Sequence, residues 1–178
     1  MKKLSLHLLL LLILFESCSS SKHDPRIEGT DLSAVIGNMT DIMLHDVTSP
    51  PLGARFFGYA CLSGYEILSQ NDSSYKSMHG VLNGYPEIKI PDTIKGYSYK
   101  LAALLAVMET SAKMQPSGYM MAKYQKTFID SLQLKGVDEL TIQNSLTYAR
   151  FITKKIMAHF NILFSFIYIL TKLVIAHS

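Results

Sequence analysis

Apolar side chains recur every three or four residues through most of the chain, and this spacing restricts the fold more than any other feature. Residues so spaced lie on one face of an α-helix. No segment shows the apolar–polar alternation of a half-buried strand, so the sequence predicts an all-α protein. We expect an incomplete helical bundle of about five helices, with an apolar C-terminal helix. The helices are expected over 31–48, 51–69, 98–114 and 119–135, and from 138 onward.

Capping residues mark the ends of these helices. Thr30 or Asp31 is the expected cap of the first helix, and Ser49 caps the second with Pro50 at its first position. Gly136 is a plausible C-terminal cap for the fourth helix. The segment 70–97 is rich in turn residues and is expected to be irregular, with at most a short extended piece over 87–90.

Each expected helix presents one apolar face to a core, and the second helix carries small residues that would admit a close neighbour. Ser63 lies on that face, where packing explains it better than a nucleophile does, because no His or acid stands at an informative spacing. The small residues are Gly53, Ala54, Gly58, Ala60 and Gly64. The core-facing residues are Leu32, Val35, Ile36, Met39, Met43, Phe56, Ala60, Ser63, Ile67, Leu101, Leu104, Leu105, Met108, Ala112, Met121, Tyr124, Phe128, Leu132, Ile142, Ser145, Ala149, Ile152 and Ile156.

The first residues have the layout of a bacterial lipoprotein export signal. A short positive start precedes a Leu-rich run that is too short to span a membrane, and Cys18 follows directly. We expect residues 1–17 to be a signal peptide, Cys18 to carry the lipid and 18–30 to be a polar tether. The alternative is an ordinary signal peptide cut nearby. A lipidated protein would be anchored in the cell envelope and face the periplasm, and Cys61 would then have no disulfide partner.

The last residues, 156–178, are apolar on nearly every side. A helix of this kind is buried or lies in a membrane. The tail is therefore either a membrane segment or the out-of-frame end of a longer reading frame, and Lys154 and Lys155 before it are either a membrane-flanking anchor or a solvated helix end.

The charge balance argues against a nucleic-acid partner. The formal net charge is only +3, and the three arginines, Arg26, Arg55 and Arg150, are far apart in the sequence. Nucleic-acid binding needs clustered positive charge. A protein partner cannot be identified from the sequence.

Several stretches together resemble the N-terminal helical region of lipoprotein-type proteins of Bacteroidetes-like bacteria in the vanadium-dependent haloperoxidase and type 2 phosphatidic acid phosphatase superfamily. Within the region 31–155, the resemblance covers the residues from about Thr40 to Lys155. It implies a helical bundle, and an acid phosphatase or vanadium haloperoxidase activity with bound phosphate or vanadate in full-length relatives. The stretches are His45–Pro51, Ala54-Arg55, Tyr59-Ala60, Gly64–Glu66, Leu82–Gly84, Leu101–Ala103 and Phe128–Leu132.

The catalytic motifs of that superfamily are missing. They supply a Lys, two Arg, a Ser-Gly-His segment and a second His, because several cations must stabilise the oxygens of a phosphoryl or vanadyl group. This chain has no Arg-Pro and no Ser-Arg, and in the near-match Pro116–Tyr119 a tyrosine replaces the acid His. We interpret that segment as a turn and helix cap, and the chain as a truncated member with no catalytic, cofactor-binding or metal-binding residues.

Other polar residues have structural explanations. His45 and Asp46 could bind a metal only together with His79, and adjacent helical residues point about 100° apart. Asp46 and Arg55 are expected to pair across the double proline. Tyr97, Tyr99 and Tyr119 either line a site or close helix interfaces, and the second is the commoner role.

Three functions follow as hypotheses, and the third is the least favoured. The chain is a lipid-anchored, non-catalytic member of this superfamily, or a small helical lipoprotein that acts as a protein-interaction module. The third is a complete phosphatase with an unrecognised site. In the first case an apolar patch is expected to lie exposed, since superfamily bundles continue with further helices. Its members would be Leu101, Leu105, Phe128 and Ile152.

Overall fold

The computed structural model describes residues 25–176, and their side chains up to His159. This part of the chain contains five helices and no strand, which confirms the all-α prediction. The helices are α2 (Gly29–His45), α3 (Pro50–Asn71), α4 (Tyr99–Met114), α5 (Gly118–Leu134) and α6 (Glu139–Ala176). The predicted signal peptide, Cys18 and most of the tether lie outside the described residues.

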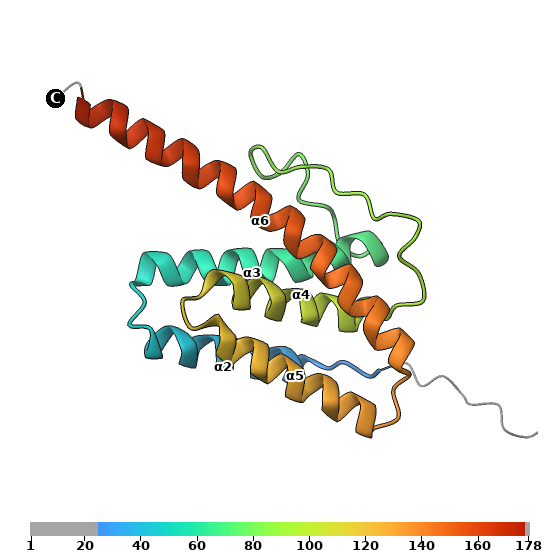
Figure 1. The fold of residues 1–178 in the computed structure, drawn as a ribbon. Coiled ribbons are helices and arrows are strands. Elements are labelled where there is room, and N and C mark those ends of the chain that lie inside the picture. Colours follow the sequence, from blue (N-terminus) through green and yellow to red (C-terminus); the bar gives the residue numbers. More distant parts are fainter. Residues whose placement is uncertain (1–24, 177–178) are drawn as a thin grey trace, which may run out of the picture.

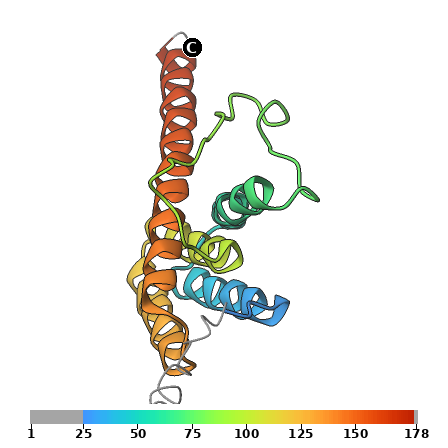
Figure 2. The same cartoon turned by 90° about the vertical axis from the view of Figure 1, so that its right-hand side faces the viewer.

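Helix α4 occupies the centre of the bundle. It contacts all four other helices, and Figures 1 and 2 show it enclosed by them. Every residue over 101–111 is buried, although the sequence predicted only one apolar face. Polar members of this stretch are satisfied by neighbours: the Thr110 and Thr153 hydroxyls lie 3.1 Å apart, and Glu109 binds Lys113 and Arg150 at 3.0 and 3.1 Å.

The core closes within the described residues. Leu101, Leu105 and Ile152 have no exposed surface, and Phe128 is half-buried. The prediction that these residues form an exposed apolar patch is therefore wrong. α4 and α6 bury each other's apolar residues, so no further helix is needed to cover these three.

The core-facing residues agree with the predicted faces at most positions. Phe56, Ala60, Ser63 and Ile67 of α3 are all buried, as are the five expected on α6. Leu32 differs, because 44% of its surface is exposed and Ile42 takes its place in the core. The other residues that differ from the predicted faces are half-buried instead of fully buried.

The start of α2 differs from the prediction. Its N-cap is Glu28, two or three residues earlier than expected, and Asp31 lies in the first turn. The Glu28 backbone N–H donates to the Asp31 carboxylate at 2.8 Å, which completes a capping box. Pro25 is buried and Ile27 packs against the core, so the last residues assigned to the tether lie on the bundle.

Helices α2 and α5 end in the same hydrogen-bonded motif. After α5, the Gly136 N–H donates to Gln133 and the Val137 N–H to Leu132, a Schellman ending with glycine at φ +81°. After α2, the Val47 and Thr48 N–H groups donate to Leu44 and Met43 in the same pattern. Here the left-handed position, at φ +51°, is occupied by Val47. Gly136 was predicted as a cap, and Val47 carries no sequence signal of one.

The irregular segment between α3 and α4 is tied to the bundle at several points. Tyr85 and Ile88 are buried, and the Ser98 N–H donates to the Ser145 hydroxyl of α6 at 3.0 Å. The piece over 87–90 pairs with no strand among the described residues.

Helix α6 is continuous from Glu139 to Ala176 and carries the predicted tail as its second half. Its C-terminal part extends beyond the other helices in both ribbon views (Figures 1 and 2). Among residues 25–159, whose side chains are described, no helix combines the length and the apolar character needed to cross a membrane.

Candidate functional site

The three residues considered for a metal site are not brought together around one position. The His45 Nδ1 lies 3.1 Å from the Asp46 Oδ1, and the His79 Nδ1 lies 3.0 Å from the Tyr85 carbonyl oxygen. No group of three or more His, Cys, Asp or Glu residues among those described is placed to hold a metal ion.

The expected pairing of Asp46 with Arg55 is wrong. The Asp46 Oδ2 instead accepts a hydrogen bond of 2.9 Å from the backbone N–H of Ser117, because the end of α2 meets the start of α5. Hydrogen bonds from the Ser117 hydroxyl and backbone amide lower the pKa of Asp46, and His45 lowers it further. Asp46 therefore joins two helices.

The segment Pro116–Tyr119 is a turn that leads into α5, as predicted. Ser117 is the N-cap and Gly118 the first helical residue. A Cβ on Gly118 would lie 1.8 Å from the Ala112 carbonyl oxygen, so only glycine fits there. Close packing against α4 therefore explains the glycine of this near-match to a Ser-Gly-His motif.

Ser63 has a structural role, as expected. Its hydroxyl is completely buried and lies 2.6 Å from the Ala60 carbonyl oxygen and 2.9 Å from that of Ala106 on α4. The adjacent Gly64 allows this approach, since a Cβ there would lie 2.8 Å from Val107 and 3.0 Å from the Ala103 oxygen. The small-residue face of α3 is therefore the α3–α4 interface, although Ala54 and Gly58 point away from it.

The three tyrosines considered for a site have different neighbours, and Tyr99 lines a hollow with Pro25 and Arg26. The Tyr97 ring packs 4.8 Å from Tyr148, and its hydroxyl donates to the Asn71 Oδ1 at 3.1 Å. Tyr119 is 70% exposed and lies in the first turn of α5. Tyr97 closes a helix interface, the commoner of the two predicted roles.

A buried polar network centred on Glu66 was not anticipated from the sequence. Glu66 is 1% exposed, and its two carboxylate oxygens accept from the Gln70 amide at 2.7 Å and the Tyr85 hydroxyl at 2.9 Å. The Tyr148 hydroxyl in turn donates to the Gln70 Oε1 at 2.8 Å. One signal was available: Glu66 falls three residues after Ser63, at the edge of the buried face.

The pKa values of the two tyrosines in this network are raised. Burial raises the pKa of Tyr85, and the neighbouring Glu66 carboxylate raises it further. Burial also raises the pKa of Tyr148. Both phenols therefore stay protonated, and their bonds hold the α3–α4 segment against α3 and α6.

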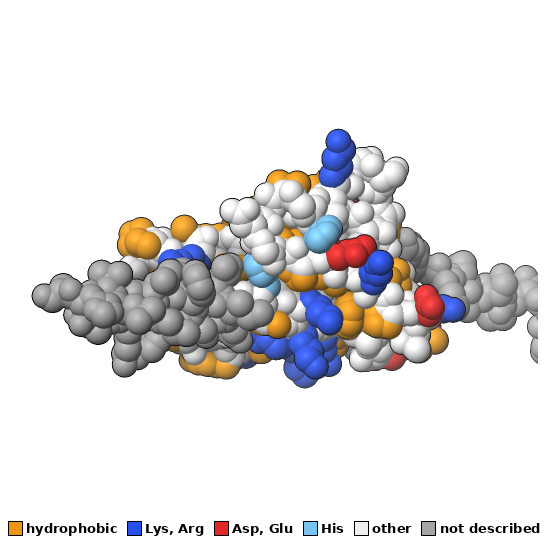
Figure 3. All heavy atoms as spheres, turned by 90° about the horizontal axis from the view of Figure 1, so that it is seen from above, with side chains coloured by type: hydrophobic (Ala, Val, Ile, Leu, Met, Phe, Trp, Pro, Cys, Tyr) orange, Lys and Arg blue, Asp and Glu red, His pale blue; other side chains and the backbone are white. Residues whose placement is uncertain are grey.

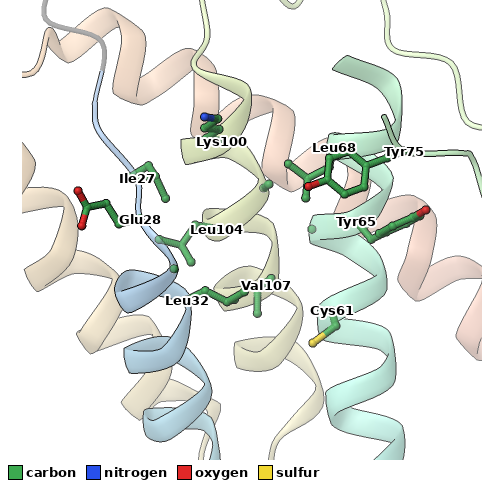
Figure 4. A pocket seen from close by; sticks show the side chains of 13 residues that line it. Ile27, Glu28, Leu32, Cys61, Tyr65, Leu68, Tyr75, Lys100, Leu104 and Val107 are labelled. Atoms are coloured by element: carbon green, nitrogen blue, oxygen red, sulfur yellow. The ribbon is translucent and has the colours of Figure 1, made fainter. Parts of the chain in front are cut away.

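The described surface also contains an apolar groove between α2 and α3, which we call the α4 groove because α4 forms its floor. Its volume is about 290 Å³ (Figure 4). Ile27, Glu28 and Leu32 form one wall, and α3 with Tyr75 forms the other. Tyr75 packs edge-on against Tyr65, with the rings 5.9 Å apart.

The chemistry of the α4 groove favours docking over catalysis. Glu28 and Lys100 are the only charged residues in its described lining, and they come from different segments. Burial raises the pKa of the Cys61 thiol, which lowers the share of reactive thiolate. The groove therefore offers an apolar surface to an apolar group.

Two of the three arginines are held by carboxylates in different places. The Arg26 Nε lies 2.8 Å from Glu28, and the Arg150 Nε lies 3.1 Å from Glu109. Arg55 lines a separate hollow with His159. The guanidinium groups therefore do not converge on one position.

Comparison with known proteins gives a match among solved structures. No family model and no curated protein matches the chain. Among solved structures, it is similar to the crystal structure of a protein described as the first bacterial vanadium-dependent iodoperoxidase, with 31% sequence identity and a TM-score of 0.69. The match covers 76% of this chain and 33% of that protein, so the chain spans about a third of its length. This likeness in sequence and fold supports a relationship to the vanadium-dependent haloperoxidase superfamily.

Proposed function

We propose that this chain is a lipid-anchored, non-catalytic member of the phosphatidic acid phosphatase and vanadium-dependent haloperoxidase superfamily. The observation that carries the proposal is the match to the iodoperoxidase at 31% identity, which covers 76% of this chain. The absence of the superfamily's oxyanion motifs from the sequence supports the non-catalytic part.

The residues present do not fit vanadate or phosphate bound in the manner of that superfamily. Such a group carries several negative charges, and each buried charge needs a converging cation. Arg26 and Arg150 are occupied by Glu28 and Glu109, and Arg55 lies apart from both. We therefore expect no retention of vanadate in equilibrium dialysis beyond that of an unrelated protein. Stoichiometric retention would contradict the proposal.

The anchor places the protein in the cell envelope, with the bundle facing the periplasm. Cells grown with labelled palmitate should incorporate label into the wild type and into Cys61→Ser, but not into Cys18→Ser. Equal labelling of Cys18→Ser would remove the anchor from the proposal. The apolar second half of α6 would provide a further membrane contact, and it places no constraint on the labelling result.

The second candidate function is a protein-interaction module, and the α4 groove favours it. The groove would take the apolar face of a partner helix, as amphipathic helices bind in hydrophobic grooves. Leu32→Glu, at the groove wall, should abolish cross-linking of the partner in intact cells without changing the unfolding midpoint. Leu44→Glu is the control, since Leu44 is 73% exposed on the same helix and lies outside the groove. Equal cross-linking in both variants would exclude the groove as the contact.

A further inference from the structure

A second hollow lies where α3, the α3–α4 segment and α6 meet. We call it the Arg55 hollow. Its volume is about 360 Å³. Its described lining is Arg55, Gly58, Tyr59 and Leu62 from α3, Leu82 and Asn83 from the segment, and His159 from α6.

The charge of this hollow is positive. Arg55 brings a permanent charge, and no carboxylate belongs to the described lining. The other arginines have carboxylate partners within 3.1 Å, whereas no ion pair of Arg55 is found among the described residues. Burial raises the pKa of Tyr59, and the positive charge of Arg55 opposes that rise, as expected for a cation close to the phenol.

The position of His159 is set by packing against its ring. The His159 ring meets the Tyr85 ring edge-on, with centroids 5.7 Å apart, and a Cβ added at Gly84 would lie 3.9 Å from the His159 Cε1. The Tyr85 hydroxyl is fixed by its 2.9 Å bond to Glu66. The buried network therefore helps to set the position of His159, the ionisable residue of α6 in the described lining.

The remaining lining is suited to an amphipathic ligand. Leu62 and Leu82 supply apolar surface, while Asn83 supplies both a donor and an acceptor. The sequence directly after His159 is the apolar second half of α6, which extends beyond the bundle (Figure 1). Seen from the side of the α3–α4 segment and α6, basic side chains are more widespread on the described surface than acidic ones (Figure 3).

We propose that the Arg55 hollow binds the phosphodiester headgroup of an anionic phospholipid. A phosphodiester carries one negative charge, which the Arg55 guanidinium can compensate with paired hydrogen bonds. Asn83 and His159 reach the remaining polar atoms, and the two leucines face the start of the acyl chains. The proposal rests on the membrane contact proposed above for the second half of α6. It does not require the lipid on Cys18.

The test compares anionic with neutral membranes. The full chain carrying Cys18→Ser is mixed with vesicles of phosphatidylcholine alone or of phosphatidylcholine and phosphatidylglycerol in equal parts, and the ratio of the two binding constants is measured. Adding Arg55→Gln should lower this ratio about fivefold, the typical effect of one cation at a membrane surface. His159→Gln should lower it in the same direction. Lys123→Gln, which removes an exposed charge from α5, should leave the ratio unchanged.

Three results would overturn the proposal. The first is an unchanged ratio in Arg55→Gln, and the second is an equal loss in Lys123→Gln, which would indicate unspecific surface charge. The third is displacement of the protein from the vesicles by inorganic phosphate at a concentration equal to that of the lipid phosphate. The hollow would then recognise free phosphate rather than lipid. All these measurements are made without an acylated cysteine, so failure of the Cys18 anchor would leave them unaffected.

Discussion

Two glycines of α3 provide a direct test of how closely α3 and α4 pack. A Cβ at Gly64 would meet Val107 at 2.8 Å and the Ala103 oxygen at 3.0 Å, whereas one at Gly58 would meet nothing within 4 Å. We expect Gly64→Ala to lower the free energy of unfolding by about 1–3 kcal/mol through overpacking. Gly58→Ala should raise it by about 0.5–1 kcal/mol, since alanine favours the helix.

Urea unfolding followed by circular dichroism measures both changes. Because the two substitutions are chemically identical and lie on the same helix, helix propensity cancels in the comparison. Equal effects at the two positions would show that Gly64 is not an interface residue.

The carboxyl of Asp46 should make stability depend on pH. Its pKa is lowered in the folded protein by Ser117, so the folded state favours the ionised form. The resulting stability is present above the unfolded pKa, about 3.9, and is lost as the pH falls through the lower folded value. The unfolding free energies of wild type and Asp46→Asn should therefore differ at neutral pH and converge below about pH 4.

Chemical denaturation at a series of pH values tests this, with Asp41→Asn as the baseline for an exposed carboxyl on the same helix. A difference between wild type and Asp46→Asn that stays constant down to about pH 2 would show that the bond to Ser117 does not depend on the charge.

At the scale of single residues, the sequence was informative where spacing alone decides the environment. Ser63 lies on an apolar helical face, and its burial followed from that position. The partner of Asp46 could not be predicted, because Ser117 is distant in sequence and meets Asp46 only through the packing of α2 on α5. The network of Glu66 depends in the same way on Tyr85, which lies in an irregular segment with no periodicity.

At the scale of the helix, the two Schellman endings suggest a stabilising substitution. Val47 holds φ at +51° in the position where α5 has Gly136, and a β-branched residue is strained there. Val47 is 89% exposed, so its side chain loses little contact on removal. We expect Val47→Gly to raise the free energy of unfolding by about 1 kcal/mol, and Gly136→Val to lower it by a similar amount.

Thermal unfolding of the two variants and of the Val47→Ala control measures this prediction. Alanine removes the branched side chain but keeps the Cβ penalty, so most of the gain should appear only with glycine. A decrease in stability for Val47→Gly would mean that Val47 makes a stabilising contact absent from the described surroundings.

Helix boundaries were largely predictable because capping residues act locally. Ser49, Pro50 and Gly136 mark the ends that the structure contains. The start of α2 was placed too late, since the sequence offered Thr30 and Asp31 as caps and the capping box uses Asp31 at the third helical position instead. The burial of α4 on all sides was missed because alanine and threonine give no strong pattern.

At the scale of the whole molecule, helix number and class followed from periodicity, and the closure of the core did not. The resemblance to longer proteins led us to expect exposed apolar residues, but Leu101, Leu105 and Ile152 are buried between α4 and neighbouring helices. Which helices pack together depends on contacts such as Ser63 to Ala106, between residues 43 positions apart in sequence. Spacing within one helix does not determine such pairs.

The central proposal is that this bundle, although similar in sequence and fold to a vanadium-dependent iodoperoxidase, lacks the residues for the chemistry. Its most direct test is turnover by the purified chain with vanadate, peroxide and iodide, and separately with a phosphomonoester. Loss of a single oxyanion donor typically costs about 10²–10³ in rate, and here the whole set is missing, so we expect no activity above that of heat-denatured protein. Turnover that is abolished by substituting any one of His45, Arg55 or His79 would contradict the claim and identify a catalytic site.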